Sequence, residues 1–436
     1  MNKEDTKKEV TLNLNRVVVT GMGVVAPNAH GLEEFETSLR DGISGIRFIP
    51  KLQELNFRCQ VGGAPQNIEE KKKSYFKDDD LVAMNQAMLY SSIAAIDAWK
   101  DASLEVPASD SEYVNWDAGC VIGCGLAGMD TIGEILVPRV KDGKVRRMGS
   151  TMVEQTMASS VSAKLSGLLA LGNQVTTNSA ACSTGTEAIY NSYLRIKFGF
   201  AEKMLAGGCD SSSEYIWGGF DSMRVTNGEA DINNPHLASR PMSATSNGFI
   251  PGSGAGVLML ESLESATKRG ARIYAELIGG AVNCGGHRNG GSMTAPNPES
   301  VQNCIKAAIK DAGIKPSDIE VVNGHLTGTM ADPKEINNWK EALDCSVDNF
   351  PLINSTKSLI GHCLGAAGSI EAVAALLELT KGFVHGSINC EDLHSEIKPY
   401  EKSIVQKTIS KDFNIIAKAS FGFGDVNSCL IFKKWV

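Results

Sequence analysis

Cys182 is the residue of this chain best placed to act as a nucleophile. Small residues surround it in the segment 178–186 (NSAACSTGT), between a predicted strand at 174–177 and a predicted helix at 183–197. A helix N-terminus presents unpaired N–H groups and partial positive charge, which lower the pKa of a thiol and favour the thiolate. A backbone N–H at this point can also donate to an oxyanion. The pattern predicts a reactive thiolate beside an oxyanion-binding backbone.

The other cysteines fit an inert, structural role better. The chain has 11 cysteines, and a free cysteine is usually buried and unreactive. Cys124, in the Gly-rich turn after a predicted strand at 118–122, is the one serious rival, but it lacks the small-residue frame of Cys182. No cysteine pair has CxxC spacing and no histidine stands at zinc-finger spacing from a cysteine, which predicts reduced thiols and no metal site.

Two histidines follow predicted strands in the second half of the chain. His325 comes just after a strand predicted at 319–323, and His362 comes just before a helix predicted at 365–379. Ligand sites of open α/β sheets lie at such strand ends. A lone histidine there is more often structural, but two of them, with Lys357 five residues before the second, favour a site. We interpret the remaining five histidines as surface residues: His30, His236, His287, His385 and His394.

Strands and helices alternate along the whole chain, which predicts an α/β fold with largely parallel sheets buried on both faces. Each half begins and ends on strands of similar character, so an internal duplication is a reasonable hypothesis. We place a loose tail at 1–15, a first half at 16–265 that contains the cysteine, and a second half at 266–436 that contains both histidines.

Composition describes a soluble protein with a large core. The 436 residues are 42% hydrophobic and 21% charged, with a net charge of −8, which argues against a nucleic-acid partner. No run of 18 apolar residues predicts a membrane span, and the polar N-terminus lacks the apolar core of a signal peptide. We therefore expect a cytoplasmic protein without a membrane partner.

Five motifs in this order resemble the β-ketoacyl-acyl-carrier-protein synthases of the type II long-chain class. They are RVVVTGMGVVAPNA at 16–29, NSAACSTGTEAI at 178–189, HLTGT at 325–329, NSTKSLIGHCLGAAGSIE at 354–371 and SFGFGDVN at 420–427. The resemblance covers about 16–436. It implies a thiolase-like fold in which two pseudo-duplicated halves form a five-layered α-β-α-β-α core.

The resemblance also implies roles for the motif residues. Cys182 would accept the acyl group as a thioester, and His325 and His362 would donate hydrogen bonds to a malonyl thioester oxygen as it becomes an enolate. Lys357 would organise His362, and Glu371 would support the network from its helix. No organic cofactor or metal would be needed beyond the phosphopantetheine of an acyl carrier protein.

The same comparison assigns positions around these residues. Phe423, with Phe421 nearby, would form a gate, and the backbone N–H groups of Cys182 and Phe423 would form the oxyanion hole. Thr327 and Thr329 would contact the phosphopantetheine arm. Leu126 would lie near the acyl pocket.

General chemistry supports these roles. Decarboxylation leaves a carbanion, which needs donors aimed at the developing oxyanion, and a nearby lysine keeps an adjacent histidine neutral by charge repulsion. A Cys-His-His set implies decarboxylating condensation. It differs from the Cys-His-Asn set of initiating synthases and from thiolases, which use a second cysteine as base; the Lys–His motif also argues against a coenzyme A thiolase.

Three departures from the family pattern stand out. Leu326 occupies a position that is usually Gly, Ser253 one that is usually Glu, and Asp425 one that is usually Gly. The chemical groups of the motifs are unchanged. The departures leave open whether the chain serves fatty acid biosynthesis or a specialised polyketide or aryl polyene pathway. A non-catalytic chain-length subunit is a further alternative, against which the presence of Cys182 argues.

Docking of an acidic carrier requires local positive charge on this acidic chain. One candidate patch contains Lys71, Lys72 and Lys73, and a second contains Arg146 and Arg147. A run of charges is more often only a solvated face, but the resemblance implies basic docking residues in both regions. It also implies a homodimer, with a chain-length subunit as a possible different partner.

Overall fold

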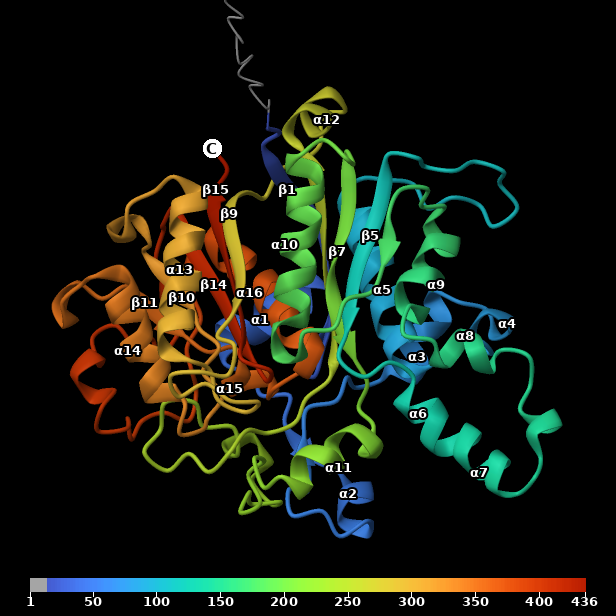
Figure 1. The fold of residues 1–436 in the computed structure, drawn as a ribbon, viewed down its shortest axis with the longest axis horizontal. Helices are drawn as coiled ribbons and strands as arrows, with labels where there is room; N and C mark the ends of the chain where they lie inside the picture. The colour runs from blue at the N-terminus through green and yellow to red at the C-terminus, as the bar shows by residue number, and fades with distance from the viewer. Residues whose placement is uncertain (1–13) are drawn as a thin grey trace, which may run out of the picture.

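Two half-sheets with the same strand order build the core of the protein (Figure 1). The computed structural model describes residues 14–436. Its main sheet runs in the order β11-β10-β14-β15-β9-β1-β8-β7-β5-β6, with β2 paired to β1. The strands of the first half are β1 (Val17–Ala26), β2 (Ala29–His30), β5 (Ala118–Cys124), β6 (Val175–Thr176), β7 (Lys203–Asp210) and β8 (Gly254–Ser262). Those of the second half are β9 (Ala275–Cys284), β10 (Val321–Asn323), β11 (Leu352–Asn354), β14 (Ile415–Gly422) and β15 (Val426–Lys434).

The pairing pattern is the same in both halves. In the first, β1–β8 and β8–β7 are antiparallel, and β7–β5 and β5–β6 are parallel. In the second, β9–β15 and β15–β14 are antiparallel, and β14–β10 and β10–β11 are parallel. The hypothesis of a duplication is therefore confirmed. The prediction of largely parallel sheets is wrong, because in each half the last strand, β8 or β15, lies between two strands to which it is antiparallel.

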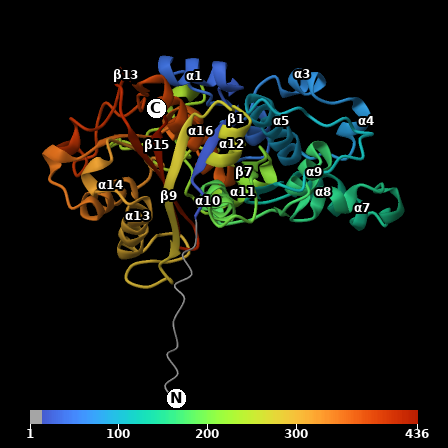
Figure 2. The same cartoon turned by 90° about the horizontal axis from the view of Figure 1, so that it is seen from above.

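Helices form three layers, one on the outer face of each half-sheet and one between the two half-sheets (Figures 1 and 2). The helices α5 (Gln86–Asp101) and α9 (Ser160–Leu169) cover the first half-sheet, and α13 (Pro298–Ala312) and α14 (Asp332–Leu343) cover the second. Between the half-sheets lie α10 (Thr184–Lys197) and α16 (Ala367–Lys381). This arrangement confirms the predicted thiolase-like fold with a five-layered core.

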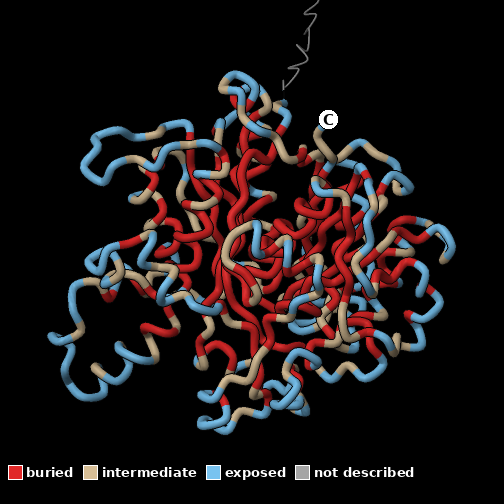
Figure 3. The backbone as a smooth tube through the Cα atoms, turned by 180° about the vertical axis from the view of Figure 1, so that it is seen from behind, coloured by how far each residue is buried: buried red, intermediate tan, exposed pale blue. Residues whose placement is uncertain are grey.

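Sequence patterns account for which helices are central. The sequence of α16, AGSIEAVAALLELTK, is apolar on all sides and is buried along almost its whole length, as a helix between two sheets must be. By contrast, α13 has buried residues on one side and the exposed charged residues Glu299, Lys306 and Lys310 on the other. The core strands are buried on both faces, as β1 (VVVTGMGVVA) shows, so burial concentrates at the centre of the molecule (Figure 3).

The shorter elements are mostly peripheral. The remaining helices are α1 (Leu32–Asp41), α2 (Pro50–Glu54), α3 (Ile68–Lys71), α4 (Asp78–Leu81), α6 (Met129–Thr131), α7 (Val137–Lys141), α8 (Met152–Thr156), α11 (Glu214–Ser222), α12 (Leu263–Lys268) and α15 (Lys357–Ile360). Two small hairpins pair β3 (Arg47–Phe48) with β4 (Val61–Gly62) and β12 (Phe383–Val384) with β13 (Ile409–Ser410). Within 14–436, no helix combines the length and apolarity required to cross a bilayer.

The expected tail at 1–15 lies outside the described residues except for its last two. Of these, Asn15 is attached to the end of α10, since its backbone N–H donates to the carbonyl of Lys197 (2.9 Å) and its side chain donates to the carbonyl of Ile196 (3.0 Å).

Glycine lets the two central helices approach closely. A Cβ added at Gly368 of α16 would lie 2.0 Å from the hydroxyl oxygen of Thr186 on α10, and one added at Gly185 would lie 2.8 Å from the backbone nitrogen of Ser369. A side chain at either position would push α10 and α16 apart. Because Cys182 directly precedes α10, the separation of these helices also sets the position of the cysteine.

We expect Gly368→Ala to lower the free energy of unfolding by about 1–3 kcal/mol, because the added methyl group overpacks the helix crossing. Gly167→Ala in α9 is the matched control, since nothing lies within 4 Å of a Cβ at Gly167 and alanine favours a helix more than glycine does. Urea unfolding of both variants checks the prediction, and equal stabilities would contradict it.

Candidate active site

Cys182 lies in a strained turn at the start of α10. The 3₁₀ turn Ala181–Ser183 contains it, and Ala181 has a φ of 47°, in a region that residues other than glycine seldom adopt. The Thr184 hydroxyl stabilises this turn, because it accepts the N–H of Ala180 (2.8 Å) and donates to the carbonyl of Ala181 (2.7 Å). The strand-to-helix turn predicted from the sequence is present, with one turn of 3₁₀ helix before α10.

The end of β14 passes directly against this turn. A Cβ at Gly422 would lie 3.0 Å from the backbone nitrogen of Cys182, so only glycine allows this approach. The backbone N–H of Phe423, the residue after Gly422, lowers the pKa of the Cys182 thiol. The Ser183 hydroxyl donates to the carbonyl of Ser420 (3.1 Å), which joins the cysteine turn to the same strand.

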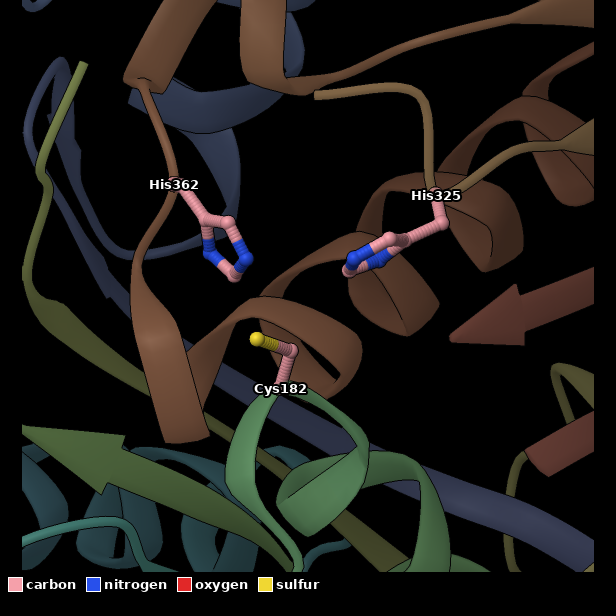
Figure 4. Close-up of side chains that lie close together, drawn as sticks. All are labelled: Cys182, His325 and His362. Atoms are coloured by element: carbon pink, nitrogen blue, oxygen red, sulfur yellow. The ribbon is translucent and has the colours of Figure 1, made fainter. Parts of the chain in front are cut away.

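The structure brings Cys182, His325 and His362 together between the two halves (Figure 4). The cysteine sulfur and one ring nitrogen of each histidine all lie within 4.8 Å of one another. The two imidazole rings are 5.3 Å apart and nearly perpendicular, at 84°. All three side chains are buried, with exposed fractions of 9%, 7% and 3%.

Hydrogen bonds fix the tautomer of both histidines. Nδ1 of His362 accepts the backbone N–H of Leu364 at 3.0 Å, so a neutral His362 carries its proton on Nε2. Nδ1 of His325 lies 3.3 Å from the Lys357 ammonium, which can only donate, and the proton of a neutral His325 is therefore also on Nε2. The site thus offers two Nε2–H donors above the cysteine.

Burial keeps both imidazoles neutral. It lowers the pKa of His325 and of His362 well below the ordinary value, and the positive charge of Lys357 lowers both pKa values further. Neutral imidazoles with fixed N–H groups can donate to an oxyanion without giving up a proton.

Lys357 contacts a different histidine from the one expected. Its ammonium lies against His325 and not against His362, which is held instead by the backbone of its own loop. Lys357 begins the short helix α15, and its side chain reaches across to His325 in the loop that follows β10. The other face of the ammonium contacts the Glu371 carboxylate of α16, as expected for a supporting role of Glu371.

The expectation of a lowered thiol pKa is wrong for this structure. Burial raises the pKa of Cys182 to about 11, which outweighs the opposing effects of the Phe423 N–H and the Lys357 charge. The helix N-terminus acts on a sulfur that is hidden from water, and desolvation disfavours the thiolate more strongly than the helix favours it. Cys182 is therefore a thiol at neutral pH and must lose its proton during the reaction.

Two carboxylates that the sequence analysis did not select shape the His325 loop. Glu335 of α14 accepts the backbone N–H groups of His325 (2.7 Å) and Leu326 (2.8 Å). Asp332 accepts those of Thr327 (2.8 Å) and Gly328 (3.0 Å). Their spacing of three residues at a helix start was visible in the sequence, but it resembles ordinary helix capping.

Asp210 and Lys418 were missed for another reason. Asp210, at the end of β7, accepts the N–H of Gly365 (2.6 Å) and that of Leu126 (3.3 Å), and burial raises its pKa to about 6. Lys418 in β14 is completely buried. In the sequence, each appears as a single charged residue at the end of an apolar strand or inside one, as Lys418 does in IIAKASFG. This pattern suggests a buried charge but does not show which residue pairs with it.

The remaining predicted site residues lie around this centre. Phe421 packs edge-on to His325, with ring centres 6.1 Å apart, and Phe423 lies 6.2 Å from Phe220. Thr327 and Thr329 are half-buried and share a hydrogen bond of 2.9 Å between their hydroxyls. Leu126 is 43% exposed. Its backbone N–H donates to Asp210, which also accepts the N–H of Gly365 in the loop after His362.

Two other interpretations from the sequence can now be judged. Cys124 is buried beside Cys209 and Asp210, which raise the pKa of its thiol together with burial, so it is a poor nucleophile. His385 is fully buried, not at the surface, and its Nε2 lies 3.0 Å from the Thr356 hydroxyl. His385 belongs to a buried polar network. In it, the side-chain amide of Asn354 donates to the carboxylate of Glu378 and to the carbonyl of His385.

The centre favours an anion over a metal ion. The sulfur and the two ring nitrogens are close enough to ligate one cation, and such a donor set suits zinc. However, the Lys357 ammonium lies 3.3 Å from one of these rings, and its positive charge opposes a cation. The same charge stabilises an oxyanion.

The two basic patches differ in exposure. Arg146 and Arg147 are exposed in the segment after α7, which projects from the body of the molecule (Figure 1). Lys73 is exposed, whereas Lys71 and Lys72 are half-buried, and Lys72 is paired with Glu69.

Comparison with known proteins identifies the family. Residues 14–266 match the β-ketoacyl synthase N-terminal domain, and residues 274–391 match the β-ketoacyl synthase C-terminal domain. The chain is 34% identical to 3-oxoacyl-[acyl-carrier-protein] synthase 2 of Vibrio harveyi, over 97% of this chain and 99% of that protein. It is 36% identical to the chloroplastic synthase II of Arabidopsis thaliana, over 100% of this chain and 79% of that protein.

Solved structures agree in fold. The ishigamide ketosynthase/chain length factor is 27% identical with a TM-score of 0.86. A type II polyketide ketosynthase in complex with its acyl carrier protein is 28% identical with a TM-score of 0.84. Each comparison covers 97% of this chain and 100% of the other. The chain belongs to the β-ketoacyl synthase family, whose members are acyltransferases that form β-ketoacyl products by condensation.

We expect alkylation of Cys182 by iodoacetamide to accelerate about tenfold per pH unit up to about pH 9, because the thiolate fraction of a thiol with a pKa near 11 rises in this way. Mass spectrometry of the Cys182 peptide gives the rate. Free cysteine, with a pKa of about 8.5, is the parallel control and should begin to level off in the same range. A Cys182 rate that is already constant at about pH 7 would contradict the raised pKa.

Proposed function

We propose that this protein extends a Cys182-bound acyl chain by two carbons from malonyl-acyl-carrier protein and releases 3-oxoacyl-acyl-carrier protein in fatty acid biosynthesis. The convergence of the Cys182 sulfur and one ring nitrogen of each of the two neutral histidines within 4.8 Å is the observation that most supports it. The similarity to 3-oxoacyl-[acyl-carrier-protein] synthases over nearly the whole chain supports the pathway.

The first half-reaction loads the cysteine. Its sulfur attacks the acyl thioester of the carrier, the thiol proton passes to the leaving pantetheine sulfur, and an acyl-cysteine forms. Because Nε2 of both imidazoles already carries a proton and Nδ1 is engaged elsewhere, the thiol proton passes to the pantetheine sulfur as that sulfur leaves, and not through a histidine. The N–H groups of Cys182 and Phe423 hold the oxyanion of the tetrahedral intermediate.

The second half-reaction forms the carbon–carbon bond. The Nε2–H groups of His325 and His362 donate to the malonyl thioester oxygen, and loss of carbon dioxide leaves an enolate on that thioester. The enolate carbon attacks the acyl-cysteine carbonyl, and the cysteine thiolate leaves and is reprotonated. The positive charge of Lys357 favours the enolate and keeps the histidines neutral. Thr327 and Thr329 contact the pantetheine arm, and Leu126 borders the acyl pocket.

We expect Cys182→Ala to abolish condensation while decarboxylation of malonyl-acyl-carrier protein continues, since the histidines remain. His325→Ala and His362→Ala should each lower the decarboxylation rate by about 100-fold, as loss of an oxyanion donor does. Product mass and carbon dioxide release measure the two steps. Condensation product that persists in Cys182→Ala would refute the mechanism.

An acidic carrier protein and a second copy of this chain are the partners we propose.

Reversal of both Arg146 and Arg147 to Glu should raise the KM for carrier-bound substrate about tenfold and leave kcat unchanged, because exposed charges act mainly on the rate at which the carrier associates with the enzyme. Lys398→Glu with Lys402→Glu is the matched control at exposed positions. If both double variants behave alike, the segment after α7 is not the docking surface.

A ketosynthase of a specialised polyketide or aryl polyene pathway is the second candidate. The structural similarity to polyketide ketosynthases, one of them described with a chain length factor, favours it. A series of acyl carriers of different length, followed by identification of products by mass, separates the two. A single extension of saturated chains supports fatty acid synthesis, whereas repeated extension without reduction supports the polyketide alternative.

A further inference from the structure

Lys418 is a fully buried lysine in the strand that leads to the site. It lies in the middle of β14, with no exposed surface. Its ammonium lies 2.8 Å from Oε2 of Glu371, as an ion pair without the alignment of a hydrogen bond. The ammonium also donates to the carbonyl of Ala419 and to the Ser420 hydroxyl, the latter at 3.2 Å.

Glu371 is shared by two buried lysines. Lys357 contacts its Oε1 and Lys418 its Oε2, and all three side chains are at most 1% exposed. Lys357 and Glu371 alone would form a neutral pair, so Lys418 adds a positive charge that this pair does not require. A buried charge beyond neutrality costs stability through desolvation, which suggests that the charge serves the site.

The surroundings of Lys418 do not cancel this charge. The ionisable groups whose charges interact with it are Glu371, Lys357, Glu335, His325, His362 and Cys429. Burial raises the pKa of Glu335 to about 7, which weakens its contribution as an anion near neutral pH. The cluster therefore sets two lysines against the one Glu371 carboxylate, directly behind the two histidines.

A second set of contacts joins Lys418 to the cysteine turn. The Ser420 hydroxyl that it touches lies 2.8 Å from the hydroxyl of Thr186 in α10. The Ser420 carbonyl accepts the hydroxyl of Ser183, the neighbour of Cys182. Lys418 thus connects the carboxylate that contacts Lys357 to its own strand, β14, which holds the cysteine turn in place.

We infer that Lys418 is a further positioning residue of this site, which shares Glu371 with Lys357 and adds positive charge behind His325 and His362 that favours neutral imidazoles and the enolate between them. The effect of Lys418 on the enolate rests on the proposed decarboxylation, whereas its contact with Glu371 and its effect on the histidines do not. Lys418 touches no reacting atom and acts through Glu371, Ser420 and the electric field.

The direction of the charge effect is defined. Lys418 lowers the pKa of His325 and of His362, so its removal raises both. Each histidine then becomes protonated at a higher pH, where it no longer presents the neutral donor. The acid limb of the pH–rate profile for malonyl decarboxylation should move to higher pH, and the loss of positive charge beside the enolate should lower the rate near neutral pH about tenfold.

Lys418→Met and Lys418→Arg in the full-length protein test the inference. Histidine ring resonances, followed by NMR against pH, should titrate at higher pH in K418M than in wild type, and K418R should restore the wild-type values. The Tm of K418M should be unchanged or raised, because Met replaces an uncompensated buried charge while Glu371 keeps Lys357. Lys434→Met, which removes a partly exposed lysine from the same sheet, is the matched control.

The outcomes separate this inference from the proposed function. Histidine titration that is unchanged in K418M would overturn it. A K418M protein that melts well below wild type and below K418R, with no change in the pH profile, would mark Lys418 as structural and would also overturn it. If wild type fails to decarboxylate malonyl-acyl-carrier protein, the proposed function fails, but the titration difference still tests Lys418.

Discussion

The buried contact between Lys357 and Glu371 is the interaction on which the site depends. A lysine ammonium can remain charged without solvent only where a carboxylate and other acceptors surround it. Glu371 provides that carboxylate from the central helix α16, and the ammonium then faces Nδ1 of His325. Lys357, held by this contact, fixes the tautomer of His325 and helps burial to keep that imidazole neutral. It also places positive charge where an enolate forms.

The duplicated fold explains why such a contact can exist. Each half-sheet sends one helix into the central layer, and the cysteine precedes one of these helices while Glu371 lies on the other. The close approach of Gly185 and Gly368 holds both helices between the half-sheets, so the nucleophile of the first half meets the histidines of the second. A site that needs water excluded is best built at such an internal boundary, because neither half alone could cover it.

The sequence predicted the parts of this site better than its electrostatics. Local patterns located Cys182, His325 and His362 at strand ends, because small residues and turns have a direct signature. The raised thiol pKa of Cys182 and the contact of Lys357 with His325 depend on burial and on segments far apart in the chain. Lys418 and His385 were missed for the same reason: a polar residue in the sequence does not reveal whether it faces water. The strand order within each half-sheet was equally out of reach, since it is decided by long-range pairing.

The departures from the family pattern can be understood as compensated changes. Leu326 has a φ of 20° where a glycine would be unstrained, but Glu335 holds its N–H, Ser355 donates to its carbonyl (2.8 Å), and its side chain is fully buried. Asp425 has a φ of 61°, and its carboxylate accepts the N–H groups of His287 (3.1 Å) and Asn297 (2.8 Å). In both cases the backbone strain of a positive φ is offset by hydrogen bonds to other segments of the chain. The altered residues therefore attach these loops to their surroundings and leave the two histidines beside the cysteine.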